Sequence, residues 1–126
     1  EICAQNALKP FRQSGEITIR IIDREEGRKL NKRWRGVNEA TNVLSFPAEG
    51  VEHVKPNLLG DLVLCAPVIR GEARTQGKGP QKHWAHMVVH GVLHLLGFDH
   101  KERAGSEEME GWERDILSKM GYSDPY

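Results

Sequence analysis

The sequence predicts a single α+β domain, in which a small mixed β-sheet packs against helices and a buried central helix carries several histidines. The chain has 126 residues, which suffice for one hydrophobic core but not for two ordinary domains. Strand and helix patterns alternate in its first half, and only helical patterns follow position 66. We therefore expect one domain over residues 1–126. The order of the strands in the sheet is not readable from these patterns.

The first half alternates helical and strand patterns. Residues 2–12 predict a short helix, because a Ser-Gly turn signal follows them. Residues 16–23 predict a half-buried strand, since isoleucine occupies every second position as far as Ile21. Residues 24–34 have the charges and the apolar spacing, up to Trp34, of an amphipathic helix.

Two further strands and three helices complete the predicted fold. Residues 41–46 and 60–65 are short apolar runs that predict strands. Residues 66–77 begin with Ala-Pro, which suits a first helical turn. Residues 81–96 place apolar side chains on all sides of a helix, which indicates a buried central position. A final helix with an acidic first turn is expected over residues 106–120.

The composition is that of a globular cytoplasmic protein. A hydrophobic share of 38% and a charged share of 29% argue against a disordered or fibrous chain. No apolar run has the roughly 20 residues that span a bilayer, so we expect no membrane contact. The first residues lack the pattern of a signal peptide. Two cysteines, Cys3 and Cys65, cannot form a disulfide framework, and reduced thiols are expected.

The charge is balanced overall but unevenly distributed. The net charge of zero argues against a general polyanion-binding tail. Residues 24–35 nevertheless hold six basic side chains against two acidic ones, whereas the segment after Lys101 is acidic. The basic segment is either a solvated helix surface or a face that holds phosphates.

Three histidines predict a catalytic metal site. His90 and His94 are four residues apart and therefore share one face of the central helix. Gly97 permits a sharp turn after the helix, and His100 follows three residues later. A lone histidine on a buried helix is usually a hydrogen-bonded core residue, but three at this spacing would leave several buried polar atoms unsatisfied. One cation satisfies all of them, and three protein ligands with an open position are typical of catalytic zinc.

Two more histidines and one aspartate lie close to this motif. His83 and His86 fall within the same stripe of the helix, but His86 is a full turn farther from the bend. We interpret His86 as a hydrogen-bonding residue behind the ligands and His83 as a surface residue. Asp99 either orients a neighbouring imidazole or replaces a missing general base.

Gly91 separates this motif from that of a zinc peptidase. The spacing matches H-E-x-x-H-x-x-G-x-x-H, but Gly91 stands where the peptidase carries its glutamate base. Without that base the peptidase mechanism is incomplete. The ligand pattern is therefore present in this chain, and the base that activates water for attack on a peptide is absent from its usual position.

Three segments in order resemble the YbeY family of endoribonucleases. They are HGVLHLLGFDH at residues 90–100, RGVNEATNVLSFP at residues 35–47 and LGDLVLC at residues 59–65. The resemblance implies a metal-dependent, single-strand-specific endoribonuclease that acts in ribosome maturation and quality control, notably at the 3′ end of small-subunit ribosomal RNA. It also implies the small ribosomal subunit and assembly factors as partners. Its metal ligands correspond to His90, His94 and His100, and its functional arginine to Arg35.

Independent chemistry is compatible with this resemblance. An arginine fork such as that of Arg35 binds phosphate oxygens bidentately and stabilises transition-state charge. Lys29, Lys32 and Arg33 lie close to Arg35 in sequence and are expected to guide the RNA backbone. We expect one zinc ion, although imidazole ligands also suit nickel, copper and iron. Attack by water and attack by the 2′-hydroxyl of the RNA both remain open.

Two alternatives belong to other functional classes. The first is a metallohydrolase that acts on peptides or small amides. The second is a non-catalytic ribosome-assembly factor whose metal is structural. Cleavage of peptides but not of RNA would favour the first, and metal-dependent folding without nuclease activity would favour the second.

Overall fold

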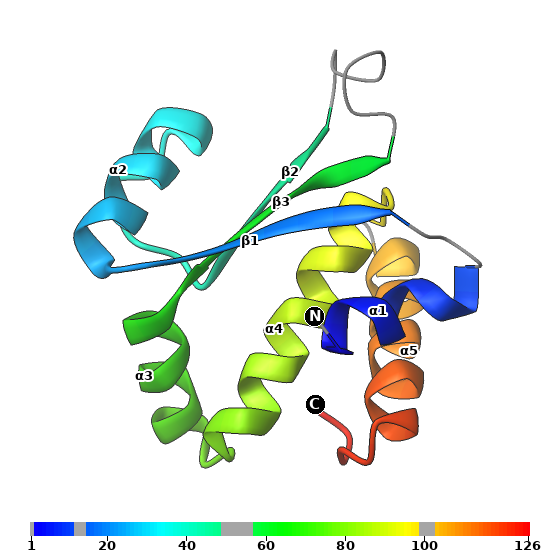
Figure 1. The fold of residues 1–126 in the computed structure, drawn as a ribbon. Coiled ribbons are helices and arrows are strands. Elements are labelled where there is room, and N and C mark those ends of the chain that lie inside the picture. Colours follow the sequence, from blue (N-terminus) through cyan, green and yellow to red (C-terminus); the bar gives the residue numbers. More distant parts are fainter. Residues whose placement is uncertain (1, 12–14, 49–56, 99–102) are drawn as a thin grey trace.

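Three strands form a mixed sheet, as the sequence predicts. The computed structural model describes residues 2–11, 15–48, 57–98 and 103–126. The strand order is β1-β3-β2, with β1 parallel and β2 antiparallel to the central strand β3 (Figure 1). The strand bounds are β1 Glu16–Ile22, β2 Val43–Pro47 and β3 Leu58–Cys65.

Helices cover both faces of this sheet. Figure 1 shows α2 on one face and α1, α4 and α5 together on the other. The middle of this second group is α4, which contacts the sheet and three other helices. The predicted buried central helix is thus confirmed. The helix bounds are α1 Ile2–Leu8, the 3-10 turn η1 Lys9–Phe11, α2 Arg24–Arg35, α3 Ala66–Gln76, α4 Pro80–Leu95 and α5 Arg103–Lys119. In the described part of the chain, no helix combines the length and the apolar character of a membrane span.

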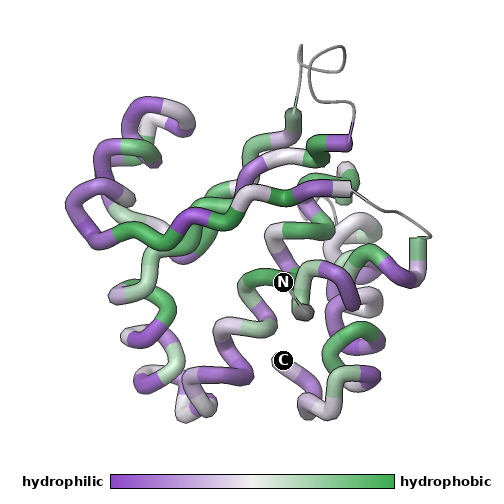
Figure 2. The backbone as a smooth tube through the Cα atoms, viewed as in Figure 1, coloured by the Kyte–Doolittle hydropathy of each residue, from purple (hydrophilic) through white to green (hydrophobic). Residues whose placement is uncertain are grey.

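The alternation of side chains along β3 divides the hydrophobic interior into two parts. Leu62 and Leu64 point to the α4 side and join the larger core. Val63 and Cys65 point to the α2 side, where Leu30 packs against them. Hydrophobic residues gather in the strands, whereas α2 is largely hydrophilic (Figure 2).

The isoleucine pattern of β1 is only partly buried. Ile17 and Ile19 pack against the larger core, but Ile21 is 63% exposed, contrary to the expected continuous alternation. Ile22, the last residue of the strand, is buried in the smaller core instead. The period-2 pattern therefore fails at the end of β1, where helices no longer cover the face on which Ile21 lies.

Both ends of α2 are fixed by local sequence. Asp23 accepts a hydrogen bond of 2.8 Å from the backbone N–H of Glu26, as an N-cap does. At the other end Gly36 adopts φ 74° and bonds back to the carbonyls of Asn31 and Lys32. This cap fixes where α2 ends and therefore where Arg35, its last residue, stands.

Gly91 is the point where α4 lies against the sheet. A Cβ at this position would be 2.8 Å from Leu62 Cδ2 and 3.2 Å from Val43 Cγ2. Ser45 Oγ donates a hydrogen bond of 3.0 Å to the Gly91 carbonyl. The absence of a side chain thus sets the distance between α4 and β2, and with it the position of the neighbouring histidine.

Candidate functional site

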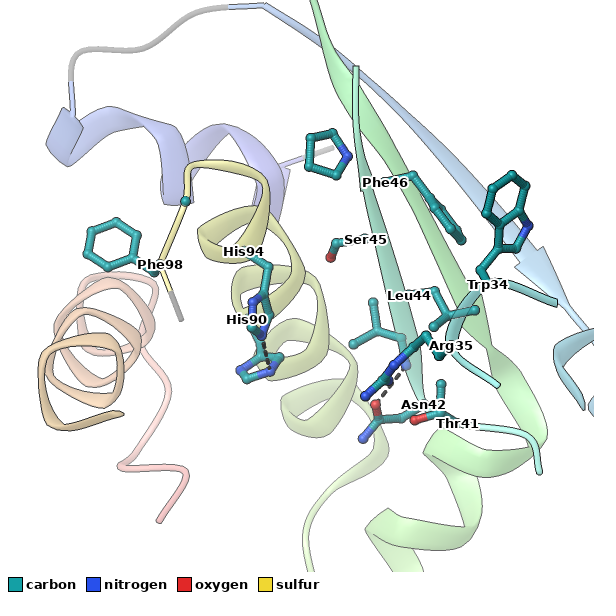
Figure 3. A pocket seen from close by; sticks show the side chains of 13 residues that line it. Trp34, Arg35, Thr41, Asn42, Leu44, Ser45, Phe46, His90, His94 and Phe98 are labelled. Carbon is teal, nitrogen blue, oxygen red and sulfur yellow. Dashed lines mark hydrogen bonds between the residues drawn. The ribbon is translucent and has the colours of Figure 1, made fainter. Parts of the chain in front are cut away.

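A column of histidines follows one side of α4. The rings of His83, His86, His90 and His94 follow one another at centroid distances of 6.1, 6.3 and 4.6 Å. Nε2 of His90 and Nε2 of His94 lie 3.1 Å apart, and both rings are half-buried. Figure 3 shows the two rings side by side on α4. The helical spacing thus brings two of the three predicted ligands together, whereas His100 lies outside the described residues.

A buried carboxylate from α5 holds this column from behind. Glu113 is 0% exposed, and its two oxygens lie 2.5 Å from His90 Nδ1 and 2.9 Å from His86 Nε2. The Tyr126 hydroxyl also donates to it. Burial by itself raises the pKa of Glu113, but the hydrogen bonds from His86, His90 and Tyr126 outweigh burial and lower the pKa to about 2.

The charge of Glu113 selects the tautomer of His90. An ionised carboxylate only accepts hydrogen bonds, so the proton of a neutral His90 ring resides on Nδ1. Its Nε2 then carries a lone pair, which is directed toward His94. A carboxylate that fixes the tautomer of a metal-binding histidine in this way is a frequent feature of metal sites.

Two positions along this column fit a metal ion. Donor atoms of His86, His90 and Glu113 all lie within 4.8 Å of one another and could hold one. The second position is between His90 and His94, whose Nε2 separation of 3.1 Å is close to the about 3.3 Å expected for two ligands of a tetrahedral zinc ion. The first cluster is more deeply buried, because Glu113 and His86 are shielded from solvent, whereas the second opens on a pocket.

This pocket has a volume of about 920 Å³ and joins three elements. His90 and His94 belong to α4, Trp34 and Arg35 to the end of α2, and β2 runs between them (Figure 3). The other lining residues are Thr41, Asn42, Val43, Leu44, Ser45, Phe46, Pro47, Gly97 and Phe98.

The exposed edge of β2 forms part of the pocket wall. Asn42 O accepts from Cys65 N, and Ala48 N donates to Leu59 O, so the even-numbered residues bond to β3. The odd-numbered residues therefore direct their backbone groups away from β3, and Val43, Ser45 and Pro47 also line the pocket. The side chain of Asn42 already accepts from the N–H of Val43 at 2.7 Å, and Pro47 has no N–H. Ser45, in the middle of the strand, therefore has its backbone N–H and carbonyl at the edge of β2 that faces away from β3.

The other predicted residues occupy different places. Lys29, Lys32 and Arg33 are exposed on α2, and the Arg33 guanidinium lies over the Trp34 ring, 5.1 Å from its centroid. Basic residues in a last helical turn also stabilise the helix C-terminus. Asp99, like His100, falls outside the described residues.

The interpretation of His83 as a surface residue is wrong. His83 is 2% exposed, and its Nε2 lies 3.0 Å from Oε1 of Glu72 on α3. Because α3 and α5 both pack on α4, the part of the histidine stripe that carries His83 and His86 does not face solvent. His86, expected behind the ligands, is buried and contacts Glu113.

Three residues of the candidate site are not predicted from the sequence. Glu113 and Tyr126 come from a helix and a C-terminal segment whose packing against α4 is a long-range feature. Trp34 was expected on the apolar face of its helix, but it is 58% exposed at the pocket. One sequence feature points to Glu113, since it lies on the apolar side of an amphipathic helix. Its neighbours Met109, Ile116 and Leu117 are buried with it.

Comparisons with known proteins agree on one family. A model of the family described as "Endoribonuclease YbeY" matches residues 2–121. A relative described as endoribonuclease YbeY of Stutzerimonas stutzeri is 54% identical over 121 residues, which are 95% of this chain and 76% of the relative. The protein so described from Pseudomonas savastanoi pv. phaseolicola is 56% identical over 120 residues, which are 94% of this chain and 72% of that protein.

The fold is also found in a solved structure. The solution structure of a protein of Thermotoga maritima superposes with a TM-score of 0.61, covering 98% of this chain and 86% of that one. The two sequences are 22% identical. This similarity concerns the fold alone.

Proposed function

The chain belongs to the endoribonuclease YbeY family, and we propose that it is a zinc-dependent endoribonuclease that cleaves single-stranded RNA. The observation that carries the proposal is the 3.1 Å approach of Nε2 of His90 to Nε2 of His94 in a pocket that also contains Arg35. Half-buried imidazoles and an arginine in one pocket suit a cation and a phosphate respectively.

We assign the metal to His90, His94 and His100. Gly97 turns the chain with φ 98°, and Gly97 and Phe98 line the same pocket, which supports the approach of the segment leading to His100. The alternative set of His86, His90 and Glu113 is less suitable for catalysis. Its carboxylate already holds both imidazoles and the Tyr126 hydroxyl, and it is closed to solvent.

The residues of the pocket divide the work on a phosphodiester. When bound, a divalent cation supplies Lewis acidity toward phosphoryl oxygens and water. Arg35 binds the phosphate oxygens and stabilises the charge that develops on them. Glu113 keeps His90 in the tautomer that leaves Nε2 unprotonated. The Ser45 backbone at the edge of β2 is available to orient the RNA strand.

We further propose ribosomal RNA as the substrate in the cell. The site would act at the 3′ end of small-subunit ribosomal RNA, in the cytoplasm, during ribosome maturation and quality control. The small ribosomal subunit and its assembly factors are the partners that follow from this role, and residues 1–126 act as one domain. The family membership supports these assignments.

The position of Gly91 argues against a peptidase. A glutamate at this position would enter the space that Leu62 and Val43 occupy against α4. The general base of a zinc peptidase therefore has no room in this packing. Family membership likewise disfavours the peptide, small-amide and non-catalytic alternatives.

Elemental analysis combined with RNA cleavage tests the proposal. We expect one zinc ion per chain in the wild type, cleavage of single-stranded RNA, and loss of both in His94→Ala. Glu113→Gln distinguishes the two metal positions, because it removes a ligand from the buried cluster but leaves the His90 and His94 pair in place. Complete loss of metal in Glu113→Gln together with full metal content in His94→Ala would overturn the assignment.

The ends of the RNA products identify the nucleophile. Attack by water leaves no cyclic phosphate, whereas attack by the 2′-hydroxyl passes through a 2′,3′-cyclic phosphate. Peptide cleavage without RNA cleavage by the zinc-loaded protein would contradict the proposed function.

A further inference from the structure

Trp34 is an exposed aromatic residue on an otherwise hydrophilic helix. Leu30, one turn earlier, packs against the smaller core, but the ring of Trp34 extends beyond it and is 58% exposed. Phe46 of β2 contacts the ring at a centroid distance of 5.9 Å and an interplanar angle of 68°. A single exposed apolar side chain is common on protein surfaces, so the position and the neighbours of this ring decide what it can bind.

The position of this ring relates it to the catalytic pocket. Trp34 and Phe46 line the same cavity as Arg35, His90 and His94. In Figure 3 Trp34 and Phe46 lie at one end of the pocket, and the histidines lie across β2 from them. A ligand whose phosphate reaches Arg35 therefore has its neighbouring group within the range of the Trp34 ring, since both side chains line this one pocket.

The surroundings of the ring select the kind of ligand. The guanidinium of Arg33 lies 5.1 Å from the Trp34 centroid, and Lys32 and Arg35 lie within two positions of Trp34 in the sequence. A flat apolar surface among cations suits a flat aromatic group attached to phosphates, as in single-stranded nucleic acids. A base inside a duplex is stacked on its neighbours and cannot present its face to such a ring.

We propose that Trp34, supported by Phe46, is a stacking site for one unpaired base next to the scissile phosphate. The inference rests on the proposed function, because it assumes that the pocket accepts RNA. It assigns the preference for single strands to a particular side chain. Arg33 contributes charge for the adjoining phosphate, and the ring contributes affinity that is largely independent of base identity.

Binding of an uncleavable strand tests this site without relying on catalysis. The probe is a fluorescein-labelled single-stranded oligodeoxynucleotide, and fluorescence anisotropy of the zinc-loaded protein gives its Kd. We expect Trp34→Ala to raise Kd by roughly 5- to 150-fold, the range found when a stacking aromatic is replaced by alanine. Trp34→Phe should retain most of the affinity. Ile21→Ala is the matched control, because Ile21 is an apolar residue of similar exposure on β1, outside the set of pocket-lining residues.

An abasic scan separates stacking from a structural role. Replacing one base of the probe by an abasic site should reproduce the loss seen in Trp34→Ala, and the loss should not increase when both changes are combined. Equal effects of Trp34→Ala on intact probes and on every abasic probe would overturn the proposal, as would unchanged binding by Trp34→Ala or no binding by the wild type. Base-dependent binding without any RNA cleavage would instead contradict the proposed function and leave the stacking site standing.

Discussion

At the scale of single residues, Glu113 determines which nitrogen of the His90 ring faces the pocket. Its buried charge accepts hydrogen bonds from two imidazoles and a phenol, so it fixes the His90 ring through Nδ1. Nε2 of His90 then faces the pocket with a lone pair and without a proton. We therefore expect Glu113 to contribute to the metal affinity of the proposed site, although it is buried behind the pocket.

We predict that Glu113→Gln lowers metal affinity by about 10- to 100-fold, the effect typical of losing a carboxylate behind a histidine ligand. The amide has the same shape but lacks the charge that favours an Nδ1–H. Competition with a chromogenic chelator measures the zinc Kd. Glu108→Gln, an exposed position on the same helix, is the control and should bind as the wild type does. Unchanged affinity in Glu113→Gln would refute this role.

The Arg35 guanidinium belongs to the pocket and suits a phosphate group. Arg35→Gln should lower kcat/KM for single-stranded RNA by about 10²- to 10³-fold, because a donor aimed at developing charge is lost. Zinc content and thermal stability should stay at wild-type values, since Arg35 is an exposed helix-terminal residue. Arg24→Gln, at the opposite end of α2, provides the comparison. Equal losses in both variants would indicate a general charge effect in place of a specific phosphate contact.

The sequence reveals local geometry at this scale but not long-range contacts. His90 and His94 are predictable as neighbours because helical spacing alone brings them together. Glu113 is not, since its contact with His90 depends on how α5 packs on α4. The wrong interpretation of His83 has the same origin, because only the placement of α3 and its Glu72 buries that ring.

At the scale of elements, the contact between α4 and the sheet controls the site. The helix approaches β2 and β3 at Gly91, and Ser45 bonds to the carbonyl there. His90 precedes this contact directly. A small change in the separation of α4 and β2 therefore moves His90 and His94 relative to Arg35.

We expect Gly91→Ala to reduce the free energy of unfolding by about 1–3 kcal/mol, since its Cβ would be 2.8 Å from Leu62 Cδ2. Gly111→Ala is the matched control within a helix, because an added Cβ there would have no other part of the described chain packed within 4 Å of it. This control should be neutral or stabilised by up to about 1 kcal/mol, as helix propensity favours alanine. Urea denaturation followed by circular dichroism measures both. Equal stability of the two variants would show that α4 moves away without cost.

The elements themselves are largely predictable from the sequence. The N-cap Asp23, the Ala-Pro start of α3 and the glycine after α4 are local features, and they define these helices. Strand order is not predictable in the same way. β1 pairs with β3, although β2 lies between them in the sequence, and no local pattern specifies this pairing.

At the scale of the whole molecule, the site lies where three separate parts of the chain meet. The end of α2, the edge of β2 and the C-terminal half of α4 meet beside β2, an edge strand that leaves one side open. The sheet and its two cores support this arrangement. Their side chains are apolar, and they are distinct from the half-buried pair of His90 and His94.

This separation of core and site predicts the response to metal removal. Chelation should lower the melting temperature by about 10 °C from that of protein held at roughly 100 times the metal Kd, where ligand binding contributes about 2.7 kcal/mol. The far-ultraviolet circular dichroism should not change at 25 °C, because the hydrophobic cores do not depend on the metal. Differential scanning calorimetry with and without chelator measures the shift, and readdition of zinc should reverse it. His94→Ala should melt at the same temperature with and without chelator. Unfolding of the wild type at 25 °C on chelation would instead indicate a structural metal, as in a non-catalytic assembly factor, and would contradict a core that is stable without it.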